Sequence, residues 1–405
     1  MKERKVVIVD ALRTPFSKYG GSLKLVPSIT LGSFVIKNIL ERNGLGAEMI
    51  EEVYYGTCEP MEIGIEINVP ARQAVLKAGL PPSVVSMTID TACCSSLDAV
   101  NLGWRSIKAG FADVVLAVGA ENMGRQTYYF PPEFRWGPHR RNMTVLDAVF
   151  RGGAYPVEGA SPVAVDAGNV AVEYGVTREE NDLWAYNSHK RYGEARQAGK
   201  FREEVIPFKG VLNKKEEVSL DIDEQHRPDV NLESLGKLPT VYGSPLVTAG
   251  NAPGINAGAS AVLLMEQDMA QKLGLKTIGE VVYVDRIAMK PSFIAVAPAI
   301  AIKKVLAKTA VSLDDMKLIE INEAFAVMPL VSTKILAEDD PEKTSKLRDI
   351  TNVNGGAIAI GHPVGASGAR ILMTLTRELA RRGGGYGIAS ICGGLAQAAG
   401  ALVKV

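Results

Sequence analysis

The sequence has little cysteine, little histidine and no surplus of charge of either sign. Four cysteines in 405 residues are too few for a disulfide framework, and no C-x-x-C pair or paired-histidine spacing indicates a metal site. With 45 basic and 45 acidic residues, electrostatics give no reason to expect nucleic acid or an anionic membrane as a partner. No segment is long and apolar enough to span a bilayer, and the first residues lack a signal-peptide layout. These absences predict a cytoplasmic protein that holds no metal.

What the chain does contain is typical of a compact α/β protein. Apolar residues make up 47% of the sequence, and its 40 glycines suit a layered fold with many tight turns. The length of 405 residues predicts two or three domains of the usual size, which is about 100–200 residues each.

Three strand-like segments of the first third recur in the same order in the last third. The pairs are VVIVD at 6–10 with VVYVD at 281–285, EEVYYG at 51–56 with KLIEIN at 317–322, and VVLAVG at 114–119 with GIASIC at 387–392. Their near-constant offset favours a duplicated α/β half over the chance echoes that any α/β chain contains. We predict one half from residues 1–120 with 249–275, a more irregular inserted loop domain at 121–248, and a second half at 276–405.

The stretch SMTIDTACCSSLDAV at 86–100 places Cys93 where a predicted strand meets a predicted helix. The helix follows from the 3-4-3 spacing of Leu97, Val100, Trp104 and Ile107. A helix N-terminus stabilises a thiolate, which is what a cysteine nucleophile needs. A cysteine in such a place is also often a small packed residue, so the residues alone permit both interpretations.

The glycine-rich stretch NGGAIAIGHPVGASGAR at 354–370 presents His362 between a glycine and a proline. Such a backbone bends tightly or lets another group approach closely. Ser367 then opens a helical pattern with apolar residues on one face. The stretch therefore predicts either a simple tight or anion-binding turn, or a loop that presents His362 to a thiol.

Polar groups also follow two other predicted strands. Asn322 and Glu323 come directly after KLIEI, and Cys392 ends a strand before GGLAQAAG. In open α/β sheets, side chains just past the C-terminal end of a strand usually face the site. Cysteine, histidine and asparagine together would also suit a papain-like hydrolase, and Cys392 could equally be a packed core residue.

Two other sets of polar residues are predicted to be solvent-exposed. One is the basic cluster Arg135, Arg140 and Arg141. The other consists of the histidines in charged surroundings, His139, His189 and His226.

Taken together, these motifs resemble those of the thiolases, the acyl-CoA C-acyltransferases, over nearly the whole chain. The matching segments are ALRTPFSKYGGSL at 11–23, NVPARQAVLKAGLP at 68–81, TAGNAPGIN at 248–256, INEAF at 321–325 and NGGAIAIGHPVGASGAR. The resemblance implies a duplicated αβαβα layered fold with an inserted loop domain on the coenzyme A side. It also implies coenzyme A thioesters as substrates, no further cofactor, and a homodimer or homotetramer.

The resemblance carries five residues into catalytic roles. Cys93 would be the acylated nucleophile, and His362 would activate it and help to form one oxyanion hole. Asn322 would hold the water of that hole, and Cys392 would move the proton at the α-carbon of the second substrate. The backbone N–H groups of Cys93 and Gly394 would form the other oxyanion hole.

The sequence also departs from the thiolase pattern. Cys94 stands where thiolases usually have glycine, and DTACCSSL is similar to the nucleophile motif of ketoacyl synthases. Leu395 and Ala396 replace glycines after the second cysteine, which predicts a reshaped acyl pocket. Pro253 occupies the place of a serine that touches coenzyme A in many members, so coenzyme A contacts are not assigned. The inserted region at 160–166 shows no counterpart of the pocket histidine of some biosynthetic members.

The favoured function is therefore reversible acyl transfer between acyl-CoA and acetyl-CoA, by formation of acetoacetyl-CoA or thiolysis of a 3-ketoacyl-CoA. The runner-up is a one-way Claisen condensing enzyme of the ketoacyl-synthase type, which Cys392 disfavours because decarboxylating synthases use histidine there. A non-catalytic acyl-CoA binder and a cysteine hydrolase are the alternatives from other classes.

Overall fold

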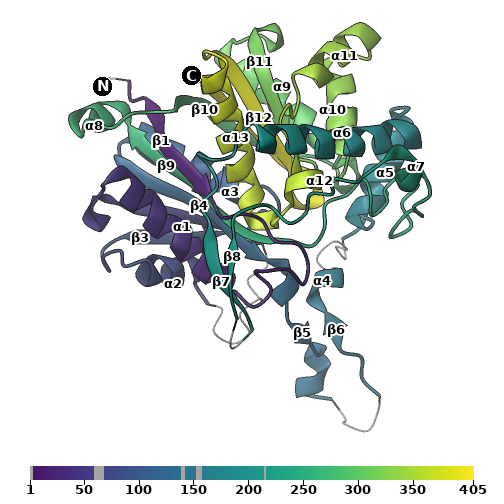
Figure 1. The fold of residues 1–405 in the computed structure, drawn as a ribbon, viewed down its shortest axis with the longest axis horizontal. Helices are drawn as coiled ribbons and strands as arrows, with labels where there is room; N and C mark the ends of the chain where they lie inside the picture. The colour runs from purple at the N-terminus through teal and green to yellow at the C-terminus, as the bar shows by residue number, and fades with distance from the viewer. Residues whose placement is uncertain (1–2, 59–67, 138–141, 152–156, 214–215) are drawn as a thin grey trace.

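A computed structural model describes residues 3–58, 68–137, 142–151, 157–213 and 216–405. Within these residues the core is one nine-stranded sheet with the strand order β11-β12-β13-β10-β1-β9-β4-β2-β3 (Figure 1). One half of the sheet comprises β1 (Val6–Arg13), β9 (Ala257–Glu266), β4 (Val114–Asn122), β2 (Glu52–Gly56) and β3 (Val85–Ile89). The other half comprises β10 (Gly279–Ala288), β13 (Gln397–Lys404), β12 (Tyr386–Cys392) and β11 (Met316–Ile321).

The two halves of the sheet mirror each other in strand order. They meet where β1 and β10 pair antiparallel, with Val7 opposite Glu280 and Ile8 opposite Gly279. Moving outward, β9 corresponds to β13, β4 to β12 and β2 to β11. β1/β10, β2/β11 and β4/β12 contain the three segment pairs that recur in the sequence, so the prediction of a duplicated α/β fold is confirmed.

Helices and sheet halves form five layers in the order helix, sheet, helix, sheet, helix. The outer helices are α1 (Ser28–Asn43) and α2 (Pro70–Lys77) on one side, and α9 (Ala297–Thr309) and α10 (Val327–Leu336) on the other. Between the halves lie α3 (Ser95–Ala109) and α13 (Ser367–Arg381), whose side chains share one buried cluster with strands of both halves. Each large apolar side chain buried there stabilises the fold by about 1.5–3 kcal/mol.

The central helices bury the faces that the sequence predicted. Leu97, Val100 and Ile107 of α3 are fully buried, and so are the apolar residues at helical spacing on α13. Gly368 in the first turn of α13 allows the two helices to approach closely, because a Cβ there would lie 2.5 Å from the Leu97 backbone nitrogen. The N-termini of both helices therefore meet, which brings residues 93 and 362 into one region.

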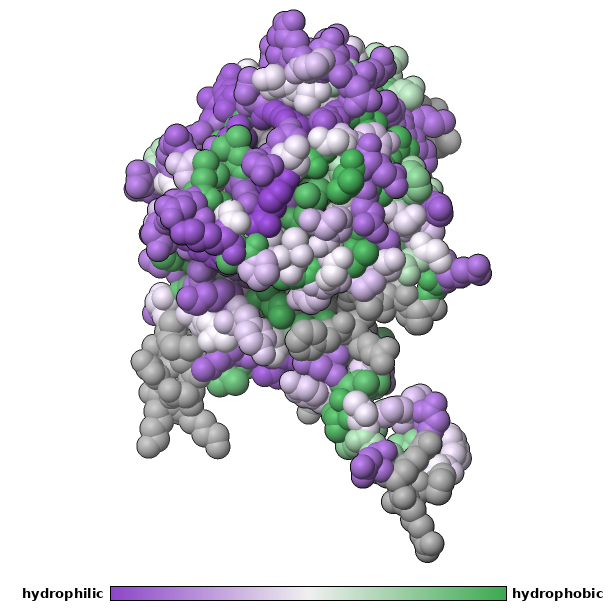
Figure 2. Space-filling view, turned by 90° about the vertical axis from the view of Figure 1, so that its right-hand side faces the viewer, coloured by the Kyte–Doolittle hydropathy of each residue, from purple (hydrophilic) through white to green (hydrophobic). Residues whose placement is uncertain are grey.

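The segment between β4 and β9 is less regular than the layers. It contains β5 (Tyr128–Tyr129), β6 (Leu146–Asp147), β7 (Phe208–Asn213), β8 (Glu216–Leu220), α4 (Ala148–Arg151), α5 (Val163–Glu173), α6 (Arg178–Gln197) and α7 (Leu232–Gly236). β5 and β6 belong to an arm that projects from the body (Figure 1), and apolar side chains gather where this arm leaves the body (Figure 2). The remaining helices are α8 (Gln267–Lys272), α11 (Pro341–Asp349) and α12 (Ala357–Ile360). None of the helices in the described ranges combines the length and apolarity that crossing a membrane requires.

The prediction that His189 lies at the surface is wrong. The side chain is 2% exposed, and its Nδ1 accepts a hydrogen bond from the Arg227 backbone N–H at 3.2 Å. His189 faces the segment that holds His226 and Arg227, and its ring lies 5.7 Å from the His226 ring, so the contact with this segment covers the side chain. His226 is half-buried, Arg135 is exposed as predicted, and His139, Arg140 and Arg141 lie outside the described residues.

Burial of His189 makes stability depend on pH. Burial, with the nearby His226 and Arg227, lowers the pKa of His189 to about 3. An unfolded histidine takes up a proton below about pH 6.5, whereas the folded one stays neutral. The free energy of unfolding should therefore fall as pH drops from about 6.5 toward 3, by up to about 1.4 kcal/mol per pH unit for this group.

His189→Gln should remove this part of the acid sensitivity, because the glutamine amide does not titrate. Urea unfolding at a series of pH values from about 8 to 5 measures the effect. Near pH 8, His189 is neutral in both the folded and the unfolded wild type. The free energies of unfolding of the wild type and His189→Gln should therefore differ there by a constant amount. The prediction would be contradicted if the free energy of unfolding fell equally with pH in both proteins down to about pH 5.

Candidate active site

A strained turn between β3 and α3 holds Cys93. Ala92 adopts a left-handed conformation with φ 53°, which is costly for a residue with a side chain. Ser95 stabilises this turn, because its Oγ accepts from the Thr91 N–H at 3.0 Å and donates to the Ala92 carbonyl at 2.6 Å. The strained turn places Cys93 just ahead of the helix, where its side chain is partly exposed.

The neighbouring cysteine has a different environment. Cys94 is buried, and its thiol donates to the Ile391 carbonyl at 3.3 Å. Burial raises the pKa of the Cys94 thiol well above its usual value, and Asp98 adds to the effect. Cys94 is thus held as a protonated packing residue, which leaves Cys93 as the accessible thiol of the pair.

The loop after α12 carries His362. Gly361 has φ 111°, a conformation that favours glycine, and the His362 backbone N–H donates to Asn256 Oδ1 at 2.8 Å. On the ring, Nδ1 lies 2.6 Å from Ser367 Oγ, whose hydroxyl donates to the Pro363 carbonyl at 2.9 Å. Since that hydroxyl proton is already used, Nδ1 is the protonated nitrogen and Nε2 is free to accept.

The free nitrogen of His362 faces the exposed thiol. Its Nε2 lies 3.3 Å from Cys93 Sγ, which is within reach of a sulfur hydrogen bond. Burial lowers the pKa of His362 to about 3, and the positive charge of Arg370 adds to this effect. A neutral imidazole aligned with a thiol can take its proton, so the pair has the geometry of an activated cysteine nucleophile.

Asn322 and Glu323 extend from the end of β11. Asn322 Nδ2 lies 3.5 Å from His362 Nε2, on the side that the thiol approaches. Glu323 is fully buried and accepts four hydrogen bonds. The donors are Trp184 Nε1 at 2.9 Å, Ser188 Oγ at 2.7 Å, Asn352 Nδ2 at 3.0 Å and the Ile358 N–H at 3.1 Å. Glu323 therefore ties α6 to the end of β11 and to the loop that leads to His362.

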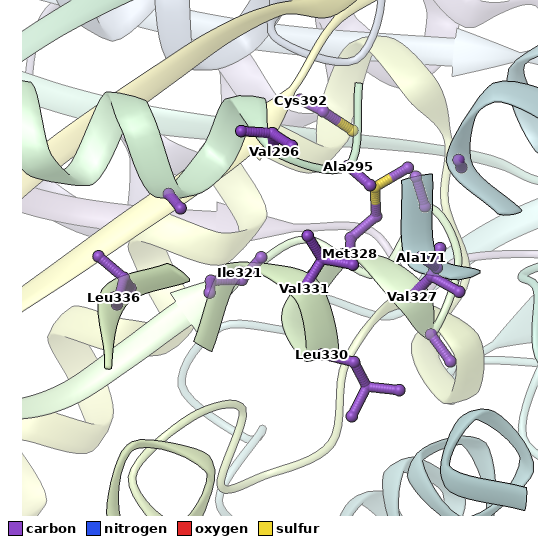
Figure 3. Close-up of a cluster of buried hydrophobic side chains, with 14 of the residues drawn as sticks. Ala171, Ala295, Val296, Ile321, Val327, Met328, Leu330, Val331, Leu336 and Cys392 are labelled. Carbon is purple, nitrogen blue, oxygen red and sulfur yellow. The ribbon is translucent and has the colours of Figure 1, made fainter. Parts of the chain in front are cut away.

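Cys392 ends β12 in apolar surroundings. Figure 3 shows it beside Ala295 and Val296 at the edge of a buried cluster, with Met328 reaching up from α10. Burial raises the pKa of the Cys392 thiol to about 12. The group is therefore protonated at rest and is a strong base once it has lost its proton.

The turn after Cys392 touches the turn that holds Cys93. A Cβ at Gly393 would lie 2.7 Å from the Thr91 carbonyl oxygen and 2.8 Å from Cys94 Sγ. Gly394 then begins a short 3-10 helix, η8 (Gly394–Ala396), in which Leu395 and Ala396 have φ 57° and 56°. Both residues take the left-handed conformation that glycine prefers, which is why glycine is the easier choice at these positions.

The comparisons with known proteins address the whole chain. The family model for the thiolase N-terminal domain matches residues 6–268, and that for the thiolase C-terminal domain matches residues 275–405. The chain belongs to the thiolase family. Family membership agrees with the five layers of helices and sheet halves, which the resemblance to thiolases implied.

Similar thiolases extend over the full length of the chain. An acetyl-CoA acetyltransferase of Syntrophomonas wolfei is 40% identical over 393 residues, or 96% of each protein. A beta-ketoadipyl-CoA thiolase of Pseudomonas knackmussii is 37% identical over 401 residues, or 97% of each. The crystal structure of human mitochondrial 3-ketoacyl-CoA thiolase superposes with a TM-score of 0.92 at 34% identity, covering 100% of both chains.

In this thiolase, the residues predicted from widely separated motifs lie in one region. Cys93 and Asn322 each lie within reach of His362, and the turn of Cys392 and Gly394 packs against the turn of Cys93. Cys93 is fixed by a helix of the first half and His362 by a helix of the second, so the duplicated fold assembles the site across its centre.

Sequence reasoning missed the residues that hold these groups in place. Ser367 was assigned only as a helix start, although its hydroxyl fixes the tautomer of His362. Glu121 is fully buried at the end of β4, and its Oε2 accepts from the Gly365 N–H at 3.0 Å and the Cys58 N–H at 2.9 Å. A serine five residues after the histidine was a readable signal, whereas nothing local in the sequence indicated Glu121.

Proposed function

We propose that this thiolase transfers acyl groups reversibly between coenzyme A thioesters through an acyl-Cys93 intermediate. The observation that carries the proposal is the 3.3 Å contact between Cys93 Sγ and the unprotonated Nε2 of His362. The names of the relatives support acetyl-CoA and 3-ketoacyl-CoA as the substrate class, and one similar solved structure is a human thiolase in complex with CoA. The reaction requires no cofactor beyond these substrates.

Thiolysis would begin with proton transfer from Cys93 to His362 Nε2. The thiolate attacks the 3-keto carbon, and the backbone N–H groups of Cys93 and Gly394 stabilise the resulting oxyanion. Preorganised donors of this kind are worth about 3 kcal/mol each. The carbon–carbon bond then breaks to give the enolate of acetyl-CoA, whose oxygen is stabilised by His362 and a water held by Asn322. The enolate carbon takes the proton of the Cys392 thiol.

The second half restores both thiols. Free coenzyme A gives its thiol proton to the Cys392 thiolate, whose high basicity follows from its apolar surroundings. The coenzyme A sulfur attacks the acyl group, and the backbone N–H groups of Cys93 and Gly394 stabilise this second oxyanion. The Cys93 sulfur leaves and recovers its proton from His362, so protons balance over the cycle. Condensation is the reverse.

Acetyl transfer to Cys93 is the direct test. The protein is incubated with acetyl-CoA and quenched, and the masses of the intact protein and its peptides are measured. One acetyl group on the peptide that holds Cys93 is expected, together with thiolysis of acetoacetyl-CoA or a longer 3-ketoacyl-CoA. Unmodified protein and intact substrates across a series of acyl chain lengths would contradict the proposal.

The runner-up, a one-way condensing enzyme, is not favoured. Cys392 supplies a basic thiol at the position where decarboxylating synthases use histidine, and the compared relatives are named as acetyltransferases and thiolases. The cysteine-hydrolase alternative is also disfavoured, because hydrolysis of a thioester to the free acid would not need the second thiol, Cys392. Detectable thiolysis by free coenzyme A separates thiolase activity from both.

We also infer a homodimer or homotetramer in the cytoplasm. Support for self-association comes from the edge strand β3, where Val85 is 64% and Met87 52% exposed, since an open apolar edge invites pairing. A reducing compartment suits the chemistry, because Cys93 and Cys392 must both remain thiols.

A further inference from the structure

Arg370 is a buried cation directly beneath the candidate site. It lies in the first turn of α13 and is fully buried. Its Nη2 donates to Asn322 Oδ1 at 3.4 Å, and its Nη1 lies 3.5 Å from Glu320 Oε2. Within the described part of the chain, its Nε and Nη1 have no hydrogen-bond partner. Burying a charge with so few partners is costly, which points to a role beyond stability.

The guanidinium determines which way the Asn322 amide faces. The oxygen and nitrogen ends of an amide are nearly the same size, so packing alone does not select one orientation. An arginine only donates, and it therefore holds Oδ1 toward α13 and turns Nδ2 toward His362. Glu320 and Asn322 are two residues apart at the end of β11, so one strand end presents both partners to the guanidinium.

The charge of Arg370 also acts on His362. Arg370 is the charged group that adds to burial in lowering the pKa of His362 to about 3. The charged groups around Arg370 itself are Glu320, Glu323, Glu204 and Arg13. Burial raises the pKa of Glu320 to about 8 despite Arg370, so this carboxyl balances the cation only in part.

We propose that Arg370 is a positioning residue for acyl transfer: its guanidinium orients the Asn322 amide toward His362. The inference rests on the proposed function but goes beyond it, because it concerns a residue that does not touch the substrate. Arg370 acts through Asn322 and His362, and its loss should therefore appear in the rate of chemistry rather than in acyl-CoA binding.

Arg370→Met is the first test, measured in thiolysis of acetoacetyl-CoA per folded molecule. Misorientation of Asn322 should lower kcat about 10- to 100-fold, with KM changed less than about threefold. The pKa of the acid limb of the kcat profile should also rise, because removing Arg370 removes the smaller of the two causes that lower the pKa of His362. A matched control is Arg377→Met on the same helix, which removes a buried arginine paired with Asp10 and Glu203. The control should lose stability without a change in the pH profile.

A double-mutant cycle with Asn322→Ala gives the second readout. If Arg370 acts by orienting Asn322, Arg370→Met should have less than about twofold further effect on kcat at pH 8 once the amide is gone. Additive losses, or an Arg370→Met variant that matches the Arg377→Met control, would overturn the inference.

Arg370→Lys covers the case in which the methionine variant does not fold. It keeps the charge but not the planar fork, so kcat should fall while the pH profile stays that of the wild type. A wild-type kcat for Arg370→Lys would also overturn the inference. Wild-type protein that acetyl-CoA does not acylate would count instead against the proposed function, so the two failures are distinguishable.

Discussion

Cys93→Ser should abolish acyl-enzyme formation and lower thiolysis on the order of 10⁴-fold or more. The serine hydroxyl is far less acidic than a thiol, and the His362 imidazole, whose pKa burial lowers to about 3, is too weak a base to activate it. The substitution removes the nucleophile but little volume, so the fold should persist. Mass measurement after exposure to acetyl-CoA, together with the rate of acetoacetyl-CoA cleavage, determines the outcome.

Cys94→Ala is the matched control for this substitution. It removes a thiol one residue away, but that thiol is buried, protonated and bonded to the Ile391 carbonyl. Loss of one weak hydrogen bond and a small volume should cost about 1–2 kcal/mol of stability and leave acetylation at Cys93. Loss of acetylation in Cys94→Ala, or thiolysis activity that remains in Cys93→Ser, would contradict the assignment of Cys93 as the nucleophile.

Cys392→Ser should separate the two half-reactions. Acetylation of Cys93 by acetyl-CoA uses Cys392 only to protonate the departing coenzyme A thiolate, which is a good leaving group even without an acid. Acetylation should therefore slow much less than condensation, and the acetyl enzyme should accumulate. Condensation and cleavage of the carbon–carbon bond need the proton transfer assigned to Cys392, and both should fall about 10²- to 10⁴-fold. A serine in the same apolar surroundings is too weak an acid to exchange its proton at the enolate carbon.

Ser390→Ala controls for disturbance of the same strand. Ser390 lies two residues before Cys392 and is fully buried, and its one hydroxyl proton is shared between the carbonyls of Pro298 and Ala399, each 3.0 Å from Oγ. Its loss should cost about 1–3 kcal/mol of stability, because buried acceptors lose their donor, and should leave condensation intact. Equal loss of acetylation and condensation in Cys392→Ser would show that Cys392 only supports the fold of the site.

The layered fold explains why these two thiols can have different roles. Cys93 lies at a strained, partly exposed turn beside a neutral histidine, whereas Cys392 lies against Ala295, Val296 and Met328 (Figure 3). The first environment suits a nucleophile that must be approached, and the second suits a proton carrier whose thiolate is a strong base. Two copies of one fold thus present similar turns with different chemistry.

Local pattern in the sequence was sufficient for much of the fold. Apolar residues at helical spacing identified α3 and α13, and recurring strand segments revealed the duplication before any pairing was known. Glycines before His362 and a strand end before Asn322 marked where polar groups would be presented. These features are readable because helix and strand periodicity depends on neighbours a few residues apart.

The tertiary structure decided what those residues do to one another. Cys93 and His362 are 269 residues apart, and they meet only because α3 and α13 pack together between the two sheet halves. The same packing buries Arg370 under Asn322. His189 is turned inward by a different contact, between α6 and the segment that holds His226 and Arg227, against the prediction from its charged neighbours. Sequence therefore determined which groups each element carries. Burial and distance decided their pKa values, tautomers and partners, because these depend on segments that are remote along the chain.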